Sequence, residues 1–298
     1  MILIGSAISF FRNEVRFPVN PAYDFDSLPE EVQQEMSQRI AEDHLENSNR
    51  FYPEAVIRDG FYNRFVKRAL DLLISSLALI LFFPINLLIG IITFFDVGSP
   101  IFFRQKRMGR NGRVFTMVKF RNMTNQVDEN GVLLRADLRV TKWGKIVRAT
   151  SLDELLNFIN IFKGDMSIIG PRPLPLSYRG RFNKYHEIRH AVRPGLDCPL
   201  RDPSKLMTWE NRLENDAWYA RNVSFRTDMK LVFLLVRETL FGRDKENRSQ
   251  GFSEGSFMGY YADGRVMDSN SIPPEFYEDL PWQGAPESGA KDTGGKAT

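Results

Sequence analysis

Residues 72–95 read LLISSLALILFFPINLLIGIITFF, with no charged side chain. These 24 residues exceed the roughly 20 apolar residues that an α-helix needs to cross a bilayer. The stretch is also too long for an ordinary surface helix. We therefore predict a membrane-embedded helix over residues 61–96.

Basic side chains flank this stretch on both sides. Between residues 64 and 172 the chain has 17 Lys or Arg and 8 Asp or Glu, out of 40 and 37 in all. No acidic residue occurs from Arg104 to Arg121. A membrane-spanning helix has its basic excess on one flank, because only that flank stays on the cytoplasmic side. Both ends are therefore predicted to lie at the anionic lipid of the inner leaflet.

Pro84 lies in the middle of the apolar stretch. Its missing N–H and its ring are expected to kink or break the helix, and Asn86 is near enough to satisfy freed backbone groups. The segment from Leu72 to Pro84 is about 18 Å long as a helix, enough to pass the bilayer midplane and turn back. This favours a re-entrant helical hairpin with its break at Pro84. A kinked single span and a buried core helix remain the alternatives.

The overall composition is that of a folded protein. The 298 residues carry a net charge of +3, with 43% hydrophobic and 26% charged residues. These values exclude wholesale disorder and a protein with many membrane spans. The single cysteine, Cys198, excludes an internal disulfide and a thiolate-rich zinc site.

Two segments outside the central part have compositions of their own. Residues 1–60 are predicted to be an accessory segment, in which a capping box at Ser27–Glu30 opens a polar helix. Residues 244–298 are a C-terminal extension, predicted to be disordered from about 284 because apolar anchors are rare there. Between them we expect a short β element over 101–120 and helices near 151–162, 176–191, 208–220 and 225–242.

The segment Ser151-Leu152-Asp153-Glu154 precedes an apolar residue pattern of helical period. Ser151 is therefore expected to be the N-cap, with Glu154 as the third helical residue. A capping box alone would explain both acidic residues. Basic and glycine-rich segments around them favour phosphate chemistry instead, since two carboxylates can hold a divalent cation against a diphosphate. The candidate contacts around this pair are Lys119, Arg121, Arg148, Asp165 and Arg172.

Short motifs follow one another in order from about Asn63 to Phe241. They are Lys67-Arg68, Ser99–Phe103, Lys119–Met123, Ser151–Leu155, Gly164–Ser167, Gly170–Pro173 and Arg193–Gly195. In this order they resemble the bacterial sugar transferases, the monotopic phosphoglycosyl transferases. The resemblance implies a membrane protein of the α-rich α+β class, with a re-entrant hairpin and a catalytic domain over residues 97–243 on the cytoplasmic face of the bacterial inner membrane.

The resemblance also implies a reaction in two steps. Asp153 would attack the β-phosphate of a nucleotide diphosphate sugar, UDP-linked in the first instance, and a polyprenyl phosphate would then accept the phosphosugar. Glu154 would bind Mg²⁺. Lys119, Arg148 and Arg172 would contact phosphate, and Pro171 to Pro173 would form a rigid wall near the nucleotide.

The chain departs from the family's pattern in three places. Phe83 precedes the hairpin proline where the family commonly has serine, and Leu156-Asn157 replaces a Pro-Gln pair. After Gly195 the usual run is replaced by Asp197-Cys198-Pro199-Leu200. The last change bears on the choice of sugar, which the sequence does not determine. The sequence also leaves a homo-oligomer open.

Two other functions compete with the transferase. His186-Glu187-Ile188-Arg189-His190 is an H-E-x-x-H sequence, which on one helix would bind Zn²⁺ in a protease, with Glu210 or Glu214 as a third ligand. Arg193-Pro194-Gly195 would end that helix within a turn, which disfavours this reading. A non-enzymatic membrane scaffold is the other alternative. Nucleic-acid binding is not expected, because the aromatic residues do not alternate with basic ones.

Overall fold

The computed structural model describes Phe25 and residues 30–52, 60–127, 129, 134, 136–241 and 255–278. Ser27 and the C-terminal tail from 284, on which two of the sequence predictions fall, lie outside these residues. The described chain is rich in helix, with three small two-stranded sheets. This confirms the α-rich part of the predicted fold class.

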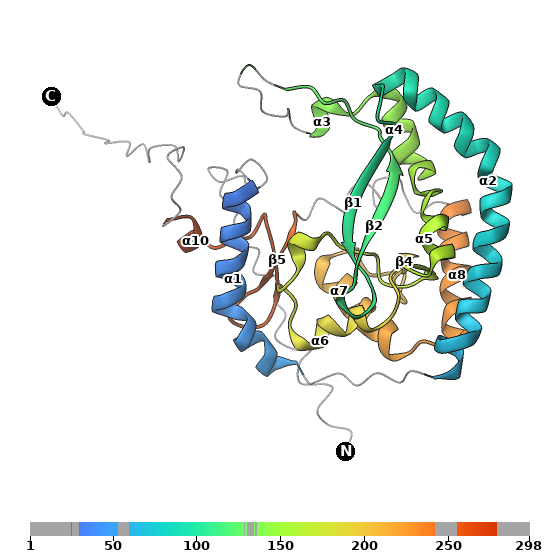
Figure 1. Cartoon of the computed structure of the whole chain (residues 1–298). Helices are drawn as coiled ribbons and strands as arrows, with labels where there is room; N and C mark the ends of the chain where they lie inside the picture. The colour runs from blue at the N-terminus through green and yellow to red at the C-terminus, as the bar shows by residue number, and fades with distance from the viewer. Residues whose placement is uncertain are drawn as a thin grey trace.

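The apolar stretch forms one long helix, α2 (Lys67–Val97), which continues from a π-helical turn, η2 (Tyr62–Val66). Pro84 lies inside this helix, which curves along one side of the molecule and over its upper end (Figure 1). The structure thus has one bent helix where the sequence predicted a break. A proline removes a single hydrogen bond, and the bonds of the turns on either side keep the helix continuous.

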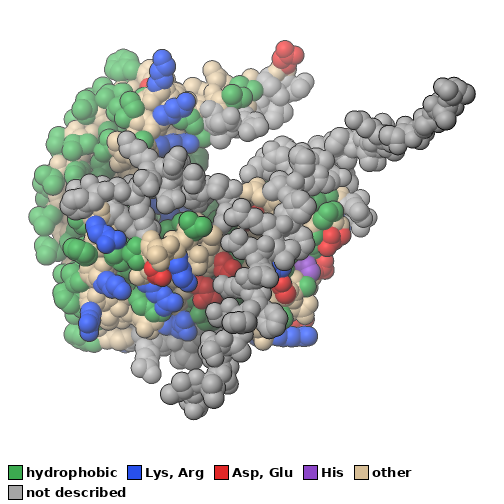
Figure 2. Space-filling model, turned by 180° about the vertical axis from the view of Figure 1, so that it is seen from behind, with side chains coloured by type: hydrophobic (Ala, Val, Ile, Leu, Met, Phe, Trp, Pro, Cys, Tyr) green, Lys and Arg blue, Asp and Glu red, His purple; other side chains and the backbone are tan. Residues whose placement is uncertain are grey.

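The outer face of α2 is apolar and exposed. Figure 2 shows hydrophobic side chains gathered along this flank of the molecule, with Lys and Arg side chains beside them. Among the described residues, one helix is long and apolar enough to cross a membrane, and it covers Tyr62–Val97. Its exposed large side chains include Leu73, Leu77, Ile80, Leu81, Phe83, Leu87, Leu88, Ile91, Phe94 and Phe95.

The inner face of α2 is held by polar groups. Lys67 Nζ lies 2.7 Å from Asp228 Oδ2, and both side chains are buried. One turn later, Asp71 Oδ1 accepts a hydrogen bond of 3.0 Å from the hydroxyl of Ser167. Buried charges are costly unless they are paired, so these contacts fix the position of α2 on the rest of the fold.

A β-hairpin follows α2. Strand β1 (Phe102–Met108) pairs antiparallel with β2 (Val114–Phe120), and the pairing places Phe102 opposite Phe120. The turn between them has two residues of positive φ, Asn111 and Gly112, which are residue types that tolerate this conformation. The predicted β element over 101–120 is therefore confirmed.

The helices between the hairpin and residue 191 are short, and two longer ones follow them. They are α3 (Ala136–Arg139), α4 (Lys142–Ala149), η4 (Leu152–Glu154), α5 (Asn157–Lys163), η5 (Leu176–Tyr178), α6 (Lys184–Glu187), η6 (Ile188–Ala191), α7 (Trp209–Arg221) and α8 (Phe225–Phe241). The predictions for 208–220 and 225–242 are confirmed by α7 and α8. The predicted helix over 176–191 is wrong, because Gly180 has φ +84° and Asn183 begins a new helix as its N-cap.

The second sheet pairs two short parallel strands, β3 (Ser167–Ile169) and β4 (Gly195–Asp197). The backbones approach closely just beyond the strand pair. A Cβ atom on Gly195 would lie 2.2 Å from the backbone nitrogen of Gly170, so only glycine fits there. This close approach fixes the position of Gly170, and so the point from which the segment Pro171–Pro173 continues.

The N-terminal helix and the C-terminal extension form one further layer (Figure 1). Helix α1 (Glu30–Phe51) packs on strand β5 (Phe257–Tyr260), which pairs with β6 (Val266–Asp268), and on helix α10 (Glu275–Glu278). The predicted polar helix after Ser27 is thus present, beginning at Glu30. The buried residues shared by these elements are Phe25, Met36, Ile40, Met258, Met267, Ile272 and Phe276.

Candidate functional site

Asp153 and Glu154 lie in the 3₁₀ turn η4, between α4 and α5. Ser151 precedes this turn at the N-cap position, and Glu154 is its third residue, as predicted. Ser151 has φ 56°, however, and makes no side-chain capping hydrogen bond, whereas a capping side chain ordinarily goes with an extended backbone. Asp153 is buried, with 7% of its surface exposed.

Two cations from distant parts of the chain meet this carboxylate pair. Lys119, at the end of β2, places Nζ 2.9 Å from Glu154 Oε1 and 3.7 Å from Asp153 Oδ2. Arg172, which follows β3, donates a hydrogen bond from Nη2 to Glu154 Oε1. The fold therefore brings together four of the predicted site residues at one place.

The two carboxylates have different electrostatic surroundings. Burial raises the pKa of Asp153 above its ordinary value, and the nearby charge of Lys119 only partly opposes this. Burial also acts to raise the pKa of Glu154, but the charges of Arg172 and Lys119 outweigh it and leave that pKa below its ordinary value. Paired carboxylates whose pKa values are pushed apart are suited to different roles in a reaction. Asp153 is the more basic of the two and Glu154 the more firmly ionised.

Arg148 approaches the pair from α4. Its Nη2 donates a hydrogen bond of 2.9 Å to Asn122 Oδ1, and burial lowers its pKa while the charge of Asp153 raises it. Gly144 allows this arrangement, because a Cβ atom there would lie 2.2 Å from the carbonyl oxygen of Asn122. The predicted phosphate contact at Arg148 thus lies within electrostatic reach of Asp153.

The segment Pro171–Pro173 is held by all three of its carbonyl groups. Pro171 O accepts from the backbone of Gly195 at 3.0 Å, and Arg172 O accepts from Arg189 Nη2 at 2.8 Å. Pro173 O accepts from Arg107 Nη1 at 3.0 Å. The segment is therefore a fixed wall that carries Arg172 to the carboxylates.

Sequence reasoning gave no role to either of these two arginines. Arg189 is buried and forms an ion pair with Asp216, its Nη2 lying 2.8 Å from Oδ2. Burial lowers the pKa of Arg107 to about 10, and the charge of Arg172 adds to this effect. Arg189 lies inside the H-E-x-x-H sequence, which gives no sign of its contact with Arg172.

Two predicted substrate contacts are not brought to the carboxylate pair. Arg121 donates from Nη2 to the carbonyl oxygens of Val97 and Gly98, where it closes the C-terminal end of α2. Asp165 follows the C-terminal end of α5, whereas Asp153 precedes its N-terminal end. Arg121 is thus engaged at the end of α2, and Asp165 lies at the other end of α5 from Asp153.

The carboxylate pair fits a divalent cation only in part. Within the described residues, no three His, Cys, Asp or Glu side chains gather as a metal site. Mg²⁺ is commonly held by one or two carboxylates together with substrate phosphates and water. Asp153 and Glu154 match this pattern, and Lys119 and Arg172 form ion pairs with Glu154.

The H-E-x-x-H sequence does not form a zinc site. His186 belongs to α6 and His190 to the 3₁₀ turn η6, so they do not share one α-helical face. His186 Nδ1 lies 2.8 Å from the hydroxyl of Tyr260, and His190 Nδ1 lies 3.1 Å from Glu187 Oε1. Both rings and the glutamate are thus used in contacts within the fold.

Comparison with known proteins now identifies the family. A model of the bacterial sugar transferase family matches residues 62–242. The chain belongs to this family. Membership confirms the resemblance seen in the sequence and places the chain among the transferase enzymes.

Three relatives illustrate the match. An uncharacterized sugar transferase, EpsL, of Bacillus subtilis is 41% identical over 145 residues, 48% of this chain and 72% of the relative. A UDP-N-acetylgalactosamine-undecaprenyl-phosphate N-acetylgalactosaminephosphotransferase of Aeromonas hydrophila is 30% identical over 71% of this chain and 51% of its own length. A UDP-glucose:undecaprenyl-phosphate glucose-1-phosphate transferase of Klebsiella pneumoniae is 37% identical over 58% of this chain and 40% of its own length. The match thus covers about half or less of the two relatives named for a reaction.

Proposed function

We propose that this protein transfers a sugar 1-phosphate from a UDP-linked sugar to undecaprenyl phosphate or a similar polyprenyl phosphate, at the start of glycan assembly. The relatives from Aeromonas hydrophila and Klebsiella pneumoniae are named for reactions of this kind. The observation that carries the proposal is the buried Asp153 beside Glu154, with Lys119 and Arg172 bound to the pair. The two relatives act on different sugars, so the sugar is left open.

In the first step the Asp153 carboxylate attacks the β-phosphorus of the donor. A bond forms between Asp153 and phosphorus, and the bond from phosphorus to the bridging oxygen breaks. The nucleoside monophosphate leaves with that electron pair. Lys119 and Arg172 are placed to bind the phosphate oxygens, and the raised pKa of Asp153 makes it a stronger nucleophile than an exposed aspartate.

In the second step a phosphate oxygen of the polyprenyl phosphate attacks the same phosphorus. The bond to Asp153 breaks, and Asp153 returns to the carboxylate form. Burial of Asp153 favours this route over hydrolysis, because it limits the access of water to the phosphosugar.

Glu154, together with Asp153, is the proposed site for Mg²⁺. The cation would neutralise charge on the diphosphate and on the leaving group. The lowered pKa of Glu154 supports this role, since a metal ligand must be ionised at neutral pH. Arg172 and Lys119 would then transfer their contacts from Glu154 to the phosphate oxygens.

The proposed membrane arrangement is re-entrant, with both ends of α2 at the cytoplasmic face of the inner membrane. Support comes from the basic residues on both flanks and from the packing of α1. Helix α1 precedes α2 in the chain and Asn183 follows it, yet Asn183 Nδ2 donates a hydrogen bond of 2.9 Å to Ser48 Oγ of α1. If α2 spanned a bilayer about 30 Å thick, the segments before and after it would lie on opposite sides, and Ser48 and Asn183 would be separated.

The test is release of uridine monophosphate from a panel of UDP-sugars by the full-length protein in detergent, with Mg²⁺ and undecaprenyl phosphate. We expect release with a restricted set of sugars. Asp153→Asn should abolish it while circular dichroism shows an unchanged fold, and Glu187→Gln, the control within the H-E-x-x-H sequence, should retain it. A fully active Asp153→Asn variant would exclude the proposed nucleophile.

Glu154→Gln tests the metal site separately. If Glu154 were only a charge in a first turn, its loss would lower stability by about 1 kcal/mol and leave activity nearly intact. We expect instead that activity collapses and that the Mg²⁺ concentration needed for half-maximal release rises in any residual activity. Glu46→Gln, an exposed change on α1, is the matched control.

A further inference from the structure

Helix α5 and strand β3 form one unit around a tight turn at residues 164–166. Gly164 has φ +94°, and the backbone nitrogens of all three turn residues donate to Asn160 O within 3.2 Å. At the other end of the unit, α5 begins three residues after Glu154, and β3 ends three residues before Arg172. The contact between Glu154 and Arg172 thus closes the unit at the end opposite its turn.

Helix α2 holds this unit on both sides of the turn, and α5 lies beside α2 (Figure 1). Arg68 donates from Nη1 to Ile161 O at 2.6 Å and from Nη2 to Phe162 O at 2.7 Å, in the last turn of α5. Asp71, three residues later and so on the same face of α2, binds β3. The membrane helix therefore contacts both arms of the unit where the chain turns between them.

Asp71 binds the edge of β3 that faces away from β4. Ser167 and Ile169 are the residues of β3 in register with β4, and successive N–H groups of a strand point to opposite edges, so the N–H of Ile168 points away from β4. Asp71 Oδ1 accepts this N–H at 3.1 Å and the hydroxyl of Ser167 at 3.0 Å. The side chain thus takes the place of a neighbouring strand, since a backbone N–H within the fold needs a partner.

A second polar connection runs from α2 to β3, but it is indirect. Lys67 Nζ lies 2.7 Å from Asp228 Oδ2. The hydroxyl of Tyr219 lies 2.7 Å from Asp228 Oδ1 and 3.0 Å from Ile169 O. Two side chains therefore separate Lys67 from the strand, whereas Asp71 contacts it directly.

One oxygen of Asp71 makes both contacts with β3. Asp71 is 3% exposed, and within the described part of the chain its Oδ2 has no hydrogen-bond partner. An asparagine has the same shape, and its amide oxygen at the Oδ1 position can also accept two hydrogen bonds. Asparagine should therefore preserve the hold on β3, and alanine should remove it.

We propose that Asp71 is a positioning residue for the transfer: from the membrane-embedded helix it fixes β3, and through β3 it sets Arg172 against the carboxylate pair. The inference rests on the proposed function, because it gives Arg172 a role in the reaction. The carbonyl groups of Pro171–Pro173 are held by residues of β1, β4 and η6, and Asp71 adds the hold from α2. A displacement of about 1 Å in a group that positions substrate can lower a rate about a hundredfold.

The test compares Asp71→Ala with Asp71→Asn in the full-length protein in detergent, by uridine monophosphate release with Mg²⁺ and undecaprenyl phosphate. We expect kcat/KM to fall about tenfold in Asp71→Ala and to stay within about threefold of the wild type in Asp71→Asn. Ser167→Ala keeps the bond from Ile168, so its kcat/KM should fall less than that of Asp71→Ala. An Asp71→Asn variant as slow as Asp71→Ala would overturn the proposal, because the amide keeps the acceptor.

Combination with Arg172→Ala shows whether Asp71 acts through Arg172. If it does, Asp71→Ala slows the wild type but changes the residual rate of Arg172→Ala by less than about twofold. This residual rate is measured at high enzyme concentration. Equal factors in the two backgrounds would overturn the proposal, since Asp71 would then act independently of Arg172.

Ile40→Ala is the control for lost stability. Ile40 is fully buried in α1, in the cluster shared with β5 and β6. We expect a lower melting temperature in this variant, with kcat/KM at 25 °C within about twofold of the wild type. If Ile40→Ala lost as much activity as Asp71→Ala at an equal fall in melting temperature, the effect of Asp71 would be one of stability and the proposal would be overturned.

Amide hydrogen exchange separates this inference from the proposed function. Residues 167–172 should exchange faster in Asp71→Ala than in the wild type and in Asp71→Asn. Faster exchange in a protein that transfers no sugar phosphate would reject the function and support the hold of Asp71 on the segment that carries Arg172. Unchanged exchange with full transfer activity in Asp71→Ala would reject the inference and keep the function.

Discussion

At the scale of single residues, the site depends on the contrast between Asp153 and Glu154. Both belong to one turn, yet burial dominates around Asp153 and the cations dominate around Glu154. Lys119 contacts both carboxylates, but it lies nearer Glu154, at 2.9 Å against 3.7 Å. A single turn thus holds one carboxylate of raised pKa, Asp153, and one of lowered pKa, Glu154.

The raised pKa of Asp153 predicts the direction of the pH dependence. Only the ionised carboxylate attacks phosphorus, so kcat/KM rises with pH as Asp153 loses its proton, over a range above the ordinary aspartate value of about 3.9. Lys119→Met removes a charge that lowers this pKa. We expect the acidic limb of the kcat/KM profile to move to higher pH in this variant, measured by uridine monophosphate release.

Lys184→Met is the control for this profile, because it removes an exposed lysine from α6. Its acidic limb should coincide with that of the wild type. A Lys119→Met profile that differs from the wild type only in height, with the same midpoint, would show that Lys119 binds substrate without affecting the ionisation of Asp153.

Gly195 gives a prediction about stability. A Cβ atom there would lie 2.2 Å from the nitrogen of Gly170, a contact between backbone atoms that no side-chain rotation relieves. Gly195→Ala should therefore lower the free energy of unfolding by about 1–3 kcal/mol, measured by thermal unfolding. Gly60→Ala is the control, because nothing lies within 4 Å of the added atom. Equal melting temperatures would mean that β4 moves away from Gly170 without cost.

At the scale of elements, α2 determines how the protein meets the membrane. It has 31 residues, about 46 Å at 1.5 Å per residue, which exceeds the roughly 30 Å of a bilayer's hydrocarbon core. A straight helix of this length would cross the bilayer. In the proposed re-entrant arrangement, the bend of α2, which has Pro84 inside it, would allow both ends to lie on one side.

Pro84→Ala tests this curvature. The alanine restores an N–H that can bond to the carbonyl of Ile80 and favours a straight helix. We expect the contact between α1 and the catalytic domain to weaken. A disulfide between Ser48→Cys and Asn183→Cys, introduced where these side chains lie 2.9 Å apart and with Cys198→Ala, should form readily in membranes of the parent and less in Pro84→Ala.

Ile85→Ala, next to the proline and also exposed, controls for the loss of apolar surface. Its disulfide yield should equal that of the parent. Equal yields in Pro84→Ala and Ile85→Ala would mean that the curvature does not depend on the proline. The yield is measured by mass spectrometry after proteolysis.

Elements with a long, uninterrupted pattern were predictable from the sequence. The hairpin over 101–120 and the helices α7 and α8 each show one period along their length. The predicted helix over 151–162 is instead divided into η4 and α5. Leu155 and Leu156 between them keep helical φ and ψ, but the backbone hydrogen bonds there join residue i to residue i+3. The spacing of apolar residues does not distinguish this tighter turn from an α-helix.

The candidate site was predictable only in part, for a similar reason. Asp153 and Glu154 were found as neighbours in the chain, and their cations through the family's motifs. Arg121 has the same charge and also belongs to one of these motifs, but its guanidinium donates hydrogen bonds to carbonyl groups at the end of α2. The role of Arg189 needs the fold, since Asp216 and the carbonyl of Arg172 are far from it in sequence.

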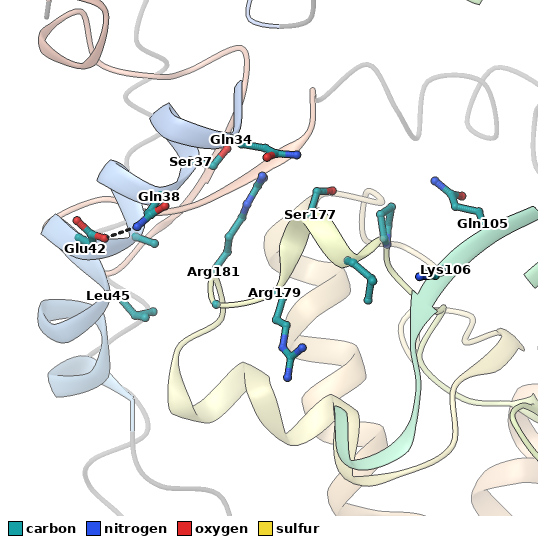
Figure 3. Close-up of a pocket in the computed structure, with 14 residues that line it drawn as sticks. Gln34, Ser37, Gln38, Glu42, Leu45, Gln105, Lys106, Ser177, Arg179 and Arg181 are labelled. Atoms are coloured by element: carbon teal, nitrogen blue, oxygen red, sulfur yellow. Dashed lines mark hydrogen bonds between the residues drawn. The ribbon is translucent and has the colours of Figure 1, made fainter. Parts of the chain in front are cut away.

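At the scale of the whole molecule, α1 and residues 255–278 build one layer beside the part of the chain that matches the family. Ile40 of α1 and Met267 of β6 are fully buried in the same cluster, although more than two hundred residues separate them. Arg181 meets this layer: its side chain extends toward Gln34 and Ser37 of α1 (Figure 3), and its Nη1 donates a hydrogen bond of 2.6 Å to Phe257 O of β5. The layer therefore packs against the rest of the fold through a buried cation as well as through apolar side chains.

Met267→Ala tests whether the layer is cooperative. Removing a buried methionine side chain costs about 2–5 kcal/mol, through lost burial and the cavity that remains. Because Met267 packs in the same cluster as Ile40, we expect amide hydrogen exchange to become faster in α1 and in β5 and β6 together, and to stay unchanged in β1 and β2. Met229→Ala, at a 41% exposed position on α8, is the control. Faster exchange confined to β5 and β6 would mean that α1 is held by its contacts with the rest of the fold alone.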